Sequence, residues 1–192
     1  MTSNKANLIF KVYIIDKYCH EWLKDLPKNH NKKIKKQVPI YLTSIIESFC
    51  SMILSDIDGK YAGDLYEDTM ITDNVIFKTF ESDAGLSEMY LKLFPEKFMK
   101  NLYKRNQDDP LDFTQEITHL LKLINSELNI DKSGIDLMNR ILNLVLEDLT
   151  TTLVFTETNK VFITVLDLKN IIRCYFPTSI SHGWLEYNTH MI

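Results

Sequence analysis

Residues 38–49 read VPIYLTSIIESF and open an amphipathic run that extends for about 25 residues. A short turn element follows at residues 69–72, with the sequence TMIT. The same layout recurs later in the chain, where residues 133–142 read SGIDLMNRIL and residues 161–164 read VFIT. This repetition predicts two similar units in one polypeptide, each built around one long helix.

Apolar residues recur in both runs at spacings of three and four, the period of a helix with one buried face. The positions are Leu42, Ile45, Ile46, Phe49, Met52, Ile53 and Ile57 in the first run, and Ile135, Met138, Leu142, Val145, Leu146, Leu149 and Leu153 in the second. Shorter helices are expected over residues 10–22, 72–81, 113–127 and 164–176, followed by an amphipathic helix that ends near residue 187. Thr72 and Thr164 are placed to cap two of them. We therefore predict an all-α fold.

Composition is typical of a globular chain, with 45% hydrophobic and 25% charged residues and a formal net charge of −4 over 192 residues. No apolar run approaches the roughly 18 residues of a membrane span, so neither a transmembrane segment nor a signal peptide is expected. Cys19, Cys50 and Cys174 form no C-x-x-C pair, so we expect a reducing compartment without a disulfide framework or a zinc site.

Short motifs occur in both halves in a consistent order. In the first half, VPIYL at residues 38–42 is followed by Glu47, Thr69-x-Ile71 and Ser82-Asp83-x-x-Leu86, and LIF-x-V at residues 8–12 precedes them; this order resembles the two-A core histone. The second half is similar to the two-B core histone, through Ile130-x-x-Ser133, Met138-Asn139, Asn159-Lys160-x-x-Ile163-Thr164 and Phe176-Pro177. The two histones resembled are natural partners of each other.

The resemblance implies two tandem histone folds, clasped as an intramolecular pseudo-heterodimer. Residues 1–94 would form the two-A-like fold, residues 95–111 the connector, and residues 112–192 the two-B-like fold with a C-terminal helix. Fused histone doublets of this kind are similar to those of large DNA viruses. The implied location is the nucleus or a viral factory, or the virion itself.

One lysine cluster precedes the first long helix: Lys28, Lys32, Lys33, Lys35 and Lys36 fall within nine residues. On charge alone this is equally a solvated surface loop. The resemblance instead makes it a DNA-contacting loop, beside Asn159 and Lys160 of the other half. The protein's net negative charge requires any DNA binding to come from such local concentrations of lysine.

The opposite end of the implied pair is less basic. There Lys132 would lie beside Glu67 and Asp68, and Met70 occupies the position at which the family inserts an arginine into the minor groove. Arginines in the minor groove are central to histone wrapping. The two ends are therefore expected to bind DNA unequally.

The resemblance also implies two protein-interaction surfaces. Glu47 and Asp83 match the acidic patch of the two-A histone, whose other acids are replaced here. The four-helix contact with a neighbouring histone pair would involve Leu153, Phe155, Ile171, Ile172 and Tyr175. Apolar residues at these five positions are equally expected of plain core.

Other functional classes fail on spacing. The sequence DIDG at residues 56–59 would place Leu54 and Leu65 at the first and last ligand positions of a calcium loop. His20 lacks the second histidine of a zinc protease motif, and the SHG sequence at residues 181–183 has no acid beside it. We expect no enzyme activity, cofactor, metal, small-molecule substrate or membrane partner.

Two hypotheses of different class remain. The first is a structural DNA-packaging histone doublet that forms part of a nucleosome-like particle, with double-stranded DNA and the companion core histones as partners. The second is a histone-fold interaction module, such as a transcription or chromatin-assembly factor, with little direct wrapping of DNA. The lysine cluster favours the first, and the acidic charge with Met70 favours the second.

Overall fold

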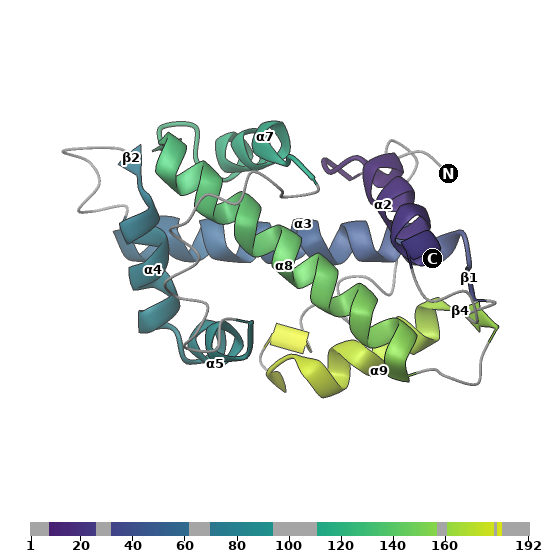
Figure 1. The fold of residues 1–192 in the computed structure, drawn as a ribbon. Coiled ribbons are helices and arrows are strands. Elements are labelled where there is room, and N and C mark those ends of the chain that lie inside the picture. Colours follow the sequence, from purple (N-terminus) through teal and green to yellow (C-terminus); the bar gives the residue numbers. More distant parts are fainter. Residues whose placement is uncertain are drawn as a thin grey trace. The chain divides into compact units, whose positions relative to one another are not determined.

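The computed structural model describes residues 8–25, 32–61, 70–93, 111–156, 161–178 and 180–181. Within these ranges the chain is mostly helical, which confirms the all-α prediction, and its strands are two residues long (Figure 1). The connector predicted for residues 95–111 and the C-terminal helix predicted to end near residue 187 lie almost entirely outside the described residues.

The same order of elements occurs twice. The first series is α2 (Val12–Asp25), β1 (Lys33–Ile34), α3 (Gln37–Tyr61), β2 (Met70–Ile71) and α4 (Asp73–Ser82), with α5 (Ala84–Leu93) following directly. The second series is α7 (Thr114–Ile124), β3 (Asn129–Ile130), α8 (Lys132–Thr156), β4 (Phe162–Ile163) and α9 (Val165–Tyr175). Both long helices have 25 residues. The four short helices predicted from the sequence are confirmed, with their ends shifted by at most three residues.

The chain divides into two compact units that do not follow the two halves of the sequence. The first unit combines residues 1–47 with residues 145–192, and the second unit comprises residues 48–144. Each long helix contributes one end to each unit, because a 25-residue helix is about 37 Å long and extends beyond one small core. The boundaries between the compact units therefore fall within α3 and α8, after residues 47 and 144.

The core of the first unit is formed by the start of α3 and the end of α8 together with α2 and α9. The side chains buried in this core include Phe10, Ile15, Cys19, Leu42, Ile45, Ile46, Leu146, Leu149, Leu168 and Ile172. Thr164 caps α9: its hydroxyl accepts from the Asp167 N–H, and the Asp167 carboxylate accepts from the Thr164 N–H at 2.8 Å. This reciprocal capping box fixes where α9 begins.

The core of the second unit is formed by the end of α3, the start of α8, and α4, α5 and α7. Its buried side chains include Phe49, Ile53, Leu54, Ile57, Ile76, Phe80, Leu86, Ile117, Leu121, Met138 and Leu142. Thr72 caps α4 by accepting from the Val75 N–H, as the sequence predicted. The apolar stripes predicted on α3 and α8 are thus buried, apart from half-buried Met52 and Ile135.

Helix α3 corrects one expectation. Over Gln37–Lys60 it is long and apolar enough to span a membrane by length and composition, with a mean hydropathy of 1.5 in its most apolar 18-residue stretch. The expectation that no apolar run approaches the length of a membrane span is therefore wrong for this helix. Of that stretch 67% is buried inside the protein, which is typical of a core helix.

Candidate functional site

A parallel strand pair in the first unit joins the loop before α3 to the loop after α8. Lys33 is the register partner of Phe162, and Ile34 is the partner of Ile163 (Figure 1). The Lys33 N–H donates to the Val161 carbonyl at 2.8 Å, and the Lys35 N–H donates to the Ile163 carbonyl at 3.0 Å. These bonds hold the loop that carries the predicted lysines against the loop that carries Phe162.

The second unit contains the reciprocal pair, which joins the loop before α8 to the loop after α3. Here Met70 pairs with Asn129 and Ile71 pairs with Ile130. The Asp131 N–H donates to the Ile71 carbonyl at 3.0 Å, which repeats the bond from Lys35 to Ile163. Ile71 and Ile163 are both buried. We call residues that correspond through these two registers equivalent; Ile34 is thus equivalent to Ile130, and Phe162 to Met70.

Three of the predicted lysines are exposed at the first strand pair. Lys33, Lys35 and Lys36 point to solvent, and Lys32 is half-buried. The ammonium of Lys35 lies 4.3 Å from the ring centroid of Phe162, whose side chain is 45% exposed. Lys28, Asn159 and Lys160 lie outside the described residues, although Lys160 directly precedes Val161 in the chain.

Carboxylates surround the equivalent position in the second unit. Asp131 is equivalent to Lys35, and its carboxylate accepts from the Gly134 N–H at 2.7 Å and from the Ser133 hydroxyl at 2.8 Å. Asp73 contacts the same hydroxyl at 3.3 Å. An acid capping the start of α8 offsets the positive end of that helix. Lys132 is exposed and directly follows Asp131 in the chain, whereas Glu67 and Asp68 lie outside the described residues.

Gly134 permits the close packing of this second pair. A Cβ at position 134 would lie 2.7 Å from the Ile71 carbonyl oxygen and 2.9 Å from a side-chain carbon of Ile130. Because the nearest atom belongs to the backbone of the paired strand, only glycine fits without moving it. This role of Gly134 is not predictable from the sequence, since Gly134 lies in an otherwise helical run.

Glu47 is half-buried, and its carboxylate is bonded to the backbone. Its carboxylate accepts from the backbone N–H groups of Ile9 and Phe10, at 2.7 and 2.8 Å, and so holds the segment that leads into α2. Asn143 does the same for the segment before α7: its amide accepts from the Leu111 N–H at 3.2 Å and donates to the Leu111 carbonyl at 2.8 Å. Sequence reasoning missed Asn143. The available signal was position, because both side chains lie 13 residues after the equivalent isoleucines Ile34 and Ile130.

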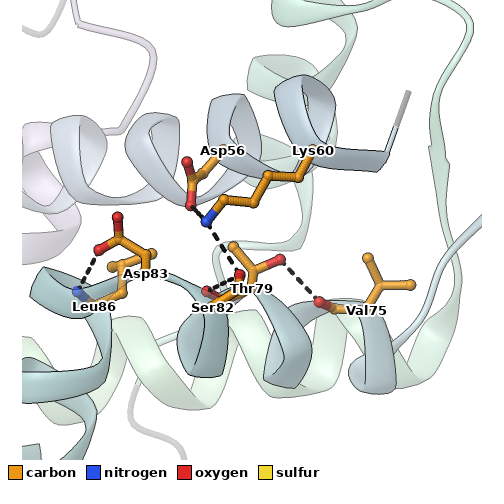
Figure 2. A network of polar contacts seen from close by, with 7 residues as sticks. All are labelled: Asp56, Lys60, Val75, Thr79, Ser82, Asp83 and Leu86. Carbon is orange, nitrogen blue, oxygen red and sulfur yellow. Dashed lines mark hydrogen bonds and ion pairs between the residues drawn. The ribbon is translucent and has the colours of Figure 1, made fainter. Parts of the chain in front are cut away.

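The carboxylate of Asp83 is also hydrogen-bonded to the backbone. One of its carboxylate oxygens accepts from the Leu86 N–H at 2.7 Å and caps α5 (Figure 2). Beside it, Lys60 bonds the carboxylate of Asp56 at 2.7 Å and the hydroxyl of Ser82 at 3.1 Å, so that a cation lies close to the predicted acid. The two acids predicted as a docking patch, Glu47 and Asp83, thus both have backbone partners within their own units.

The five residues predicted for assembly with a partner differ in how exposed their side chains are. Leu153, Ile171 and Ile172 are buried in the first unit, whereas Phe155 is 61% exposed. The side chain of Tyr175 lies outside the described residues. Phe155 is therefore the member of this set that a partner protein can reach in the protein as described.

Two neighbouring side chains of α2, Tyr18 and Cys19, have pKa values raised by burial. Within the part of the chain that the structure describes, no group of three or more His, Cys, Asp or Glu residues is placed to hold a metal ion. Burial raises the pKa of the Cys19 thiol to about 12, so it stays protonated and weakly nucleophilic. Burial likewise raises the pKa of Tyr18 to about 12, against the effect of its hydrogen bond to Thr150.

Comparison with known proteins adds no family assignment. No protein-family model, no curated protein and no solved structure matches this chain.

Proposed function

We propose that this protein is a structural DNA-packaging histone doublet, with a two-A-like and a two-B-like histone fold in one chain. The observation that carries the proposal is the reciprocal pairing of loops. The strand before each long helix pairs with the strand after the other long helix, in the same parallel register. Two histone folds that clasp each other require this reciprocity, because each fold alone is an open set of three helices.

The repeated order of elements supports the same reading. Each series has a short helix, a strand, a long helix, a strand and a short helix, and the long helices are equal in length. Equivalent residues also make equivalent bonds, as Glu47 and Asn143 show with the segments before α2 and α7. The compact units, each assembled from both halves of the sequence, fit a pair of interlocked folds.

DNA binding is assigned to the first strand pair. Lys33, Lys35 and Lys36 are three exposed lysines directly before α3. Each ammonium that contacts a phosphate releases counterions, which supplies most of the affinity for duplex DNA. The second strand pair has Asp73 and Asp131 in the corresponding region, so it binds DNA weakly.

The alternative function is a histone-fold interaction module with little direct wrapping of DNA. It is supported by the net charge of −4, by the acids at the second strand pair, and by exposed Phe155. In this alternative the clasped folds serve as a scaffold for another protein, and the lysines of the first strand pair are a solvated surface.

The salt dependence of duplex binding separates these functions. Changing Lys33, Lys35 and Lys36 together to Glu removes up to three phosphate contacts, so the slope of log affinity against log salt should fall by about 2 to 3. Lys132→Glu, at the position directly after Asp131, is the control and should change the slope little. If the wild type has no affinity for duplex DNA at low salt, alone or with companion core histones, the packaging proposal is wrong and the interaction module replaces it.

A further inference from the structure

An exposed aromatic ring lies on a rigid support at the first strand pair. Phe162 begins β4 and is 45% exposed, although large aromatic side chains usually lie in the core. Backbone hydrogen bonds on either side of it, from Lys33 to Val161 and from Lys35 to Ile163, pin its strand to β1. The ring therefore projects from a fixed backbone.

Cations flank this ring. Lys33 is the register partner of Phe162, and the Lys35 ammonium lies 4.3 Å from the ring centroid. An ammonium over an aromatic face is attracted by the ring, which holds the two side chains together in the unbound protein. A ligand that complements this surface must offer both a flat apolar face and negative charge. Nucleic acid combines these two properties in every nucleotide.

The second unit provides an internal reference. Met70 is equivalent to Phe162 and is exposed to the same degree, 44%. Its register partner is Asn129 instead of a lysine, and Asp131 replaces Lys35. An exposed apolar side chain thus occurs at both strand pairs, but Asn129 and Asp131 stand at the second pair where Lys33 and Lys35 stand at the first.

We infer that Phe162 inserts its ring against the bases of duplex DNA while Lys33 and Lys35 hold the flanking phosphates. Proteins that enter the minor groove commonly place an apolar wedge against a base step and partly unstack it. The inference rests on the proposed function and names the side chain that contacts bases at the same site. Lys35 moves from the ring to a phosphate on binding, which frees a ring face for stacking.

The test uses full-length protein and a duplex that carries 2-aminopurine, a base analogue whose fluorescence rises when it unstacks. Wild-type protein should raise the fluorescence. Phe162→Ala should abolish the rise and weaken binding by about fivefold or more, the loss expected for one base–aromatic contact. The slope of log affinity against log salt should stay unchanged, since no phosphate contact is removed.

Met70→Ala is the matched control, because it removes an equally exposed apolar side chain from the equivalent position. With no lysine pair to bring DNA to that strand pair, its affinity should stay within about twofold of wild type. Phe162→Leu provides a second variant that keeps an apolar side chain able to act as a wedge at a base step. It should keep most of the fluorescence rise, and its melting temperature shows that the fold is intact.

The outcomes distinguish this inference from the proposed function. If the wild type binds duplex with the expected salt slope but gives no fluorescence rise, or if Phe162→Ala matches wild type in both measurements, the insertion is overturned and DNA packaging stands. A larger loss for a single-stranded oligonucleotide than for the duplex also overturns it, in favour of stacking on unpaired bases. If the wild type binds no DNA, both fall together.

Discussion

Glu47 and Asn143 occupy equivalent positions on the two long helices, and each bonds the backbone that leads into the first short helix of its own half. The Glu47 carboxylate accepts two N–H groups, whereas the Asn143 amide both accepts and donates. The two positions are therefore equivalent, but the two residue types cannot replace each other. This difference in hydrogen-bond roles gives a test of the repeat at single-atom level.

Glu47→Gln should be tolerated, because the amide oxygen still accepts from Ile9 and Phe10. Asn143→Asp should be more damaging, since a carboxylate cannot donate to the carbonyl oxygens of Leu111 and Asn139. We expect Asn143→Asp to lower the free energy of unfolding by about 1 to 3 kcal/mol, the cost of buried groups left without partners. Urea denaturation measures both. Equal effects of the two substitutions would contradict the assigned roles.

Two glycines in helices should respond oppositely to alanine. Gly134→Ala places a Cβ against the Ile71 carbonyl and should destabilise the protein by about 1 to 3 kcal/mol, as overpacking does. Gly59→Ala meets nothing within 4 Å and should stabilise helix α3 by about 0.5 to 1 kcal/mol. The two midpoints of urea denaturation give the comparison. A stabilising Gly134→Ala would show that the second strand pair is not closely packed.

The stability of the protein should depend on pH because of Asp148. Burial raises the pKa of its carboxyl above the ordinary 3.8, and the neighbouring charge of Glu147 adds to this effect. The Oδ2 atom of Asp148 is buried without a hydrogen-bond partner in the described structure. The folded state therefore binds the proton more tightly than the unfolded state, and stability falls as pH rises through the raised pKa. Asp148→Asn should stabilise the protein at pH 7, and the gain should vanish as pH falls below 3.8. Thermal melts across this range measure it, and a gain that persists at low pH would refute the cause given.

Substitutions at Phe155 and Leu153 test the proposed assembly with a partner protein. Phe155→Glu changes a side chain that is 61% exposed, so the melting temperature should stay close to that of wild type while co-migration with companion core histones is lost. Leu153→Glu buries a charge in the first unit and should unfold it. Size-exclusion chromatography with parallel melts makes the comparison. Retained co-migration of Phe155→Glu would remove Phe155 from the proposed contact.

The helices were predictable because their signals are local. Apolar spacing located α3 and α8, and Thr72 and Thr164 marked where α4 and α9 begin. The strands gave no such signal, since two residues cannot show a period. Their pairing joins residues more than 50 positions apart in the chain, so it depends on tertiary packing that no local pattern encodes.

The candidate site was only partly predictable. The density of lysine pointed to Lys33, Lys35 and Lys36, and the structure places all three at the surface. Phe162 was missed because an apolar residue in the sequence VFIT is expected to lie in the core. Its exposure, 45%, is visible only in the structure. Glu47 looked like a surface acid, because its two backbone partners lie 37 and 38 residues away in sequence.

Nuclease protection of duplex DNA in the presence of companion core histones tests the proposed packaging function most directly. Wild-type protein should protect a discrete length of DNA. The segment held by the first strand pair should lose its protection when Lys33, Lys35 and Lys36 are changed to Glu, whereas Lys132→Glu should leave the protected length unchanged. Uniform digestion of the DNA with wild-type protein present, as complete as without it, would contradict the proposed function.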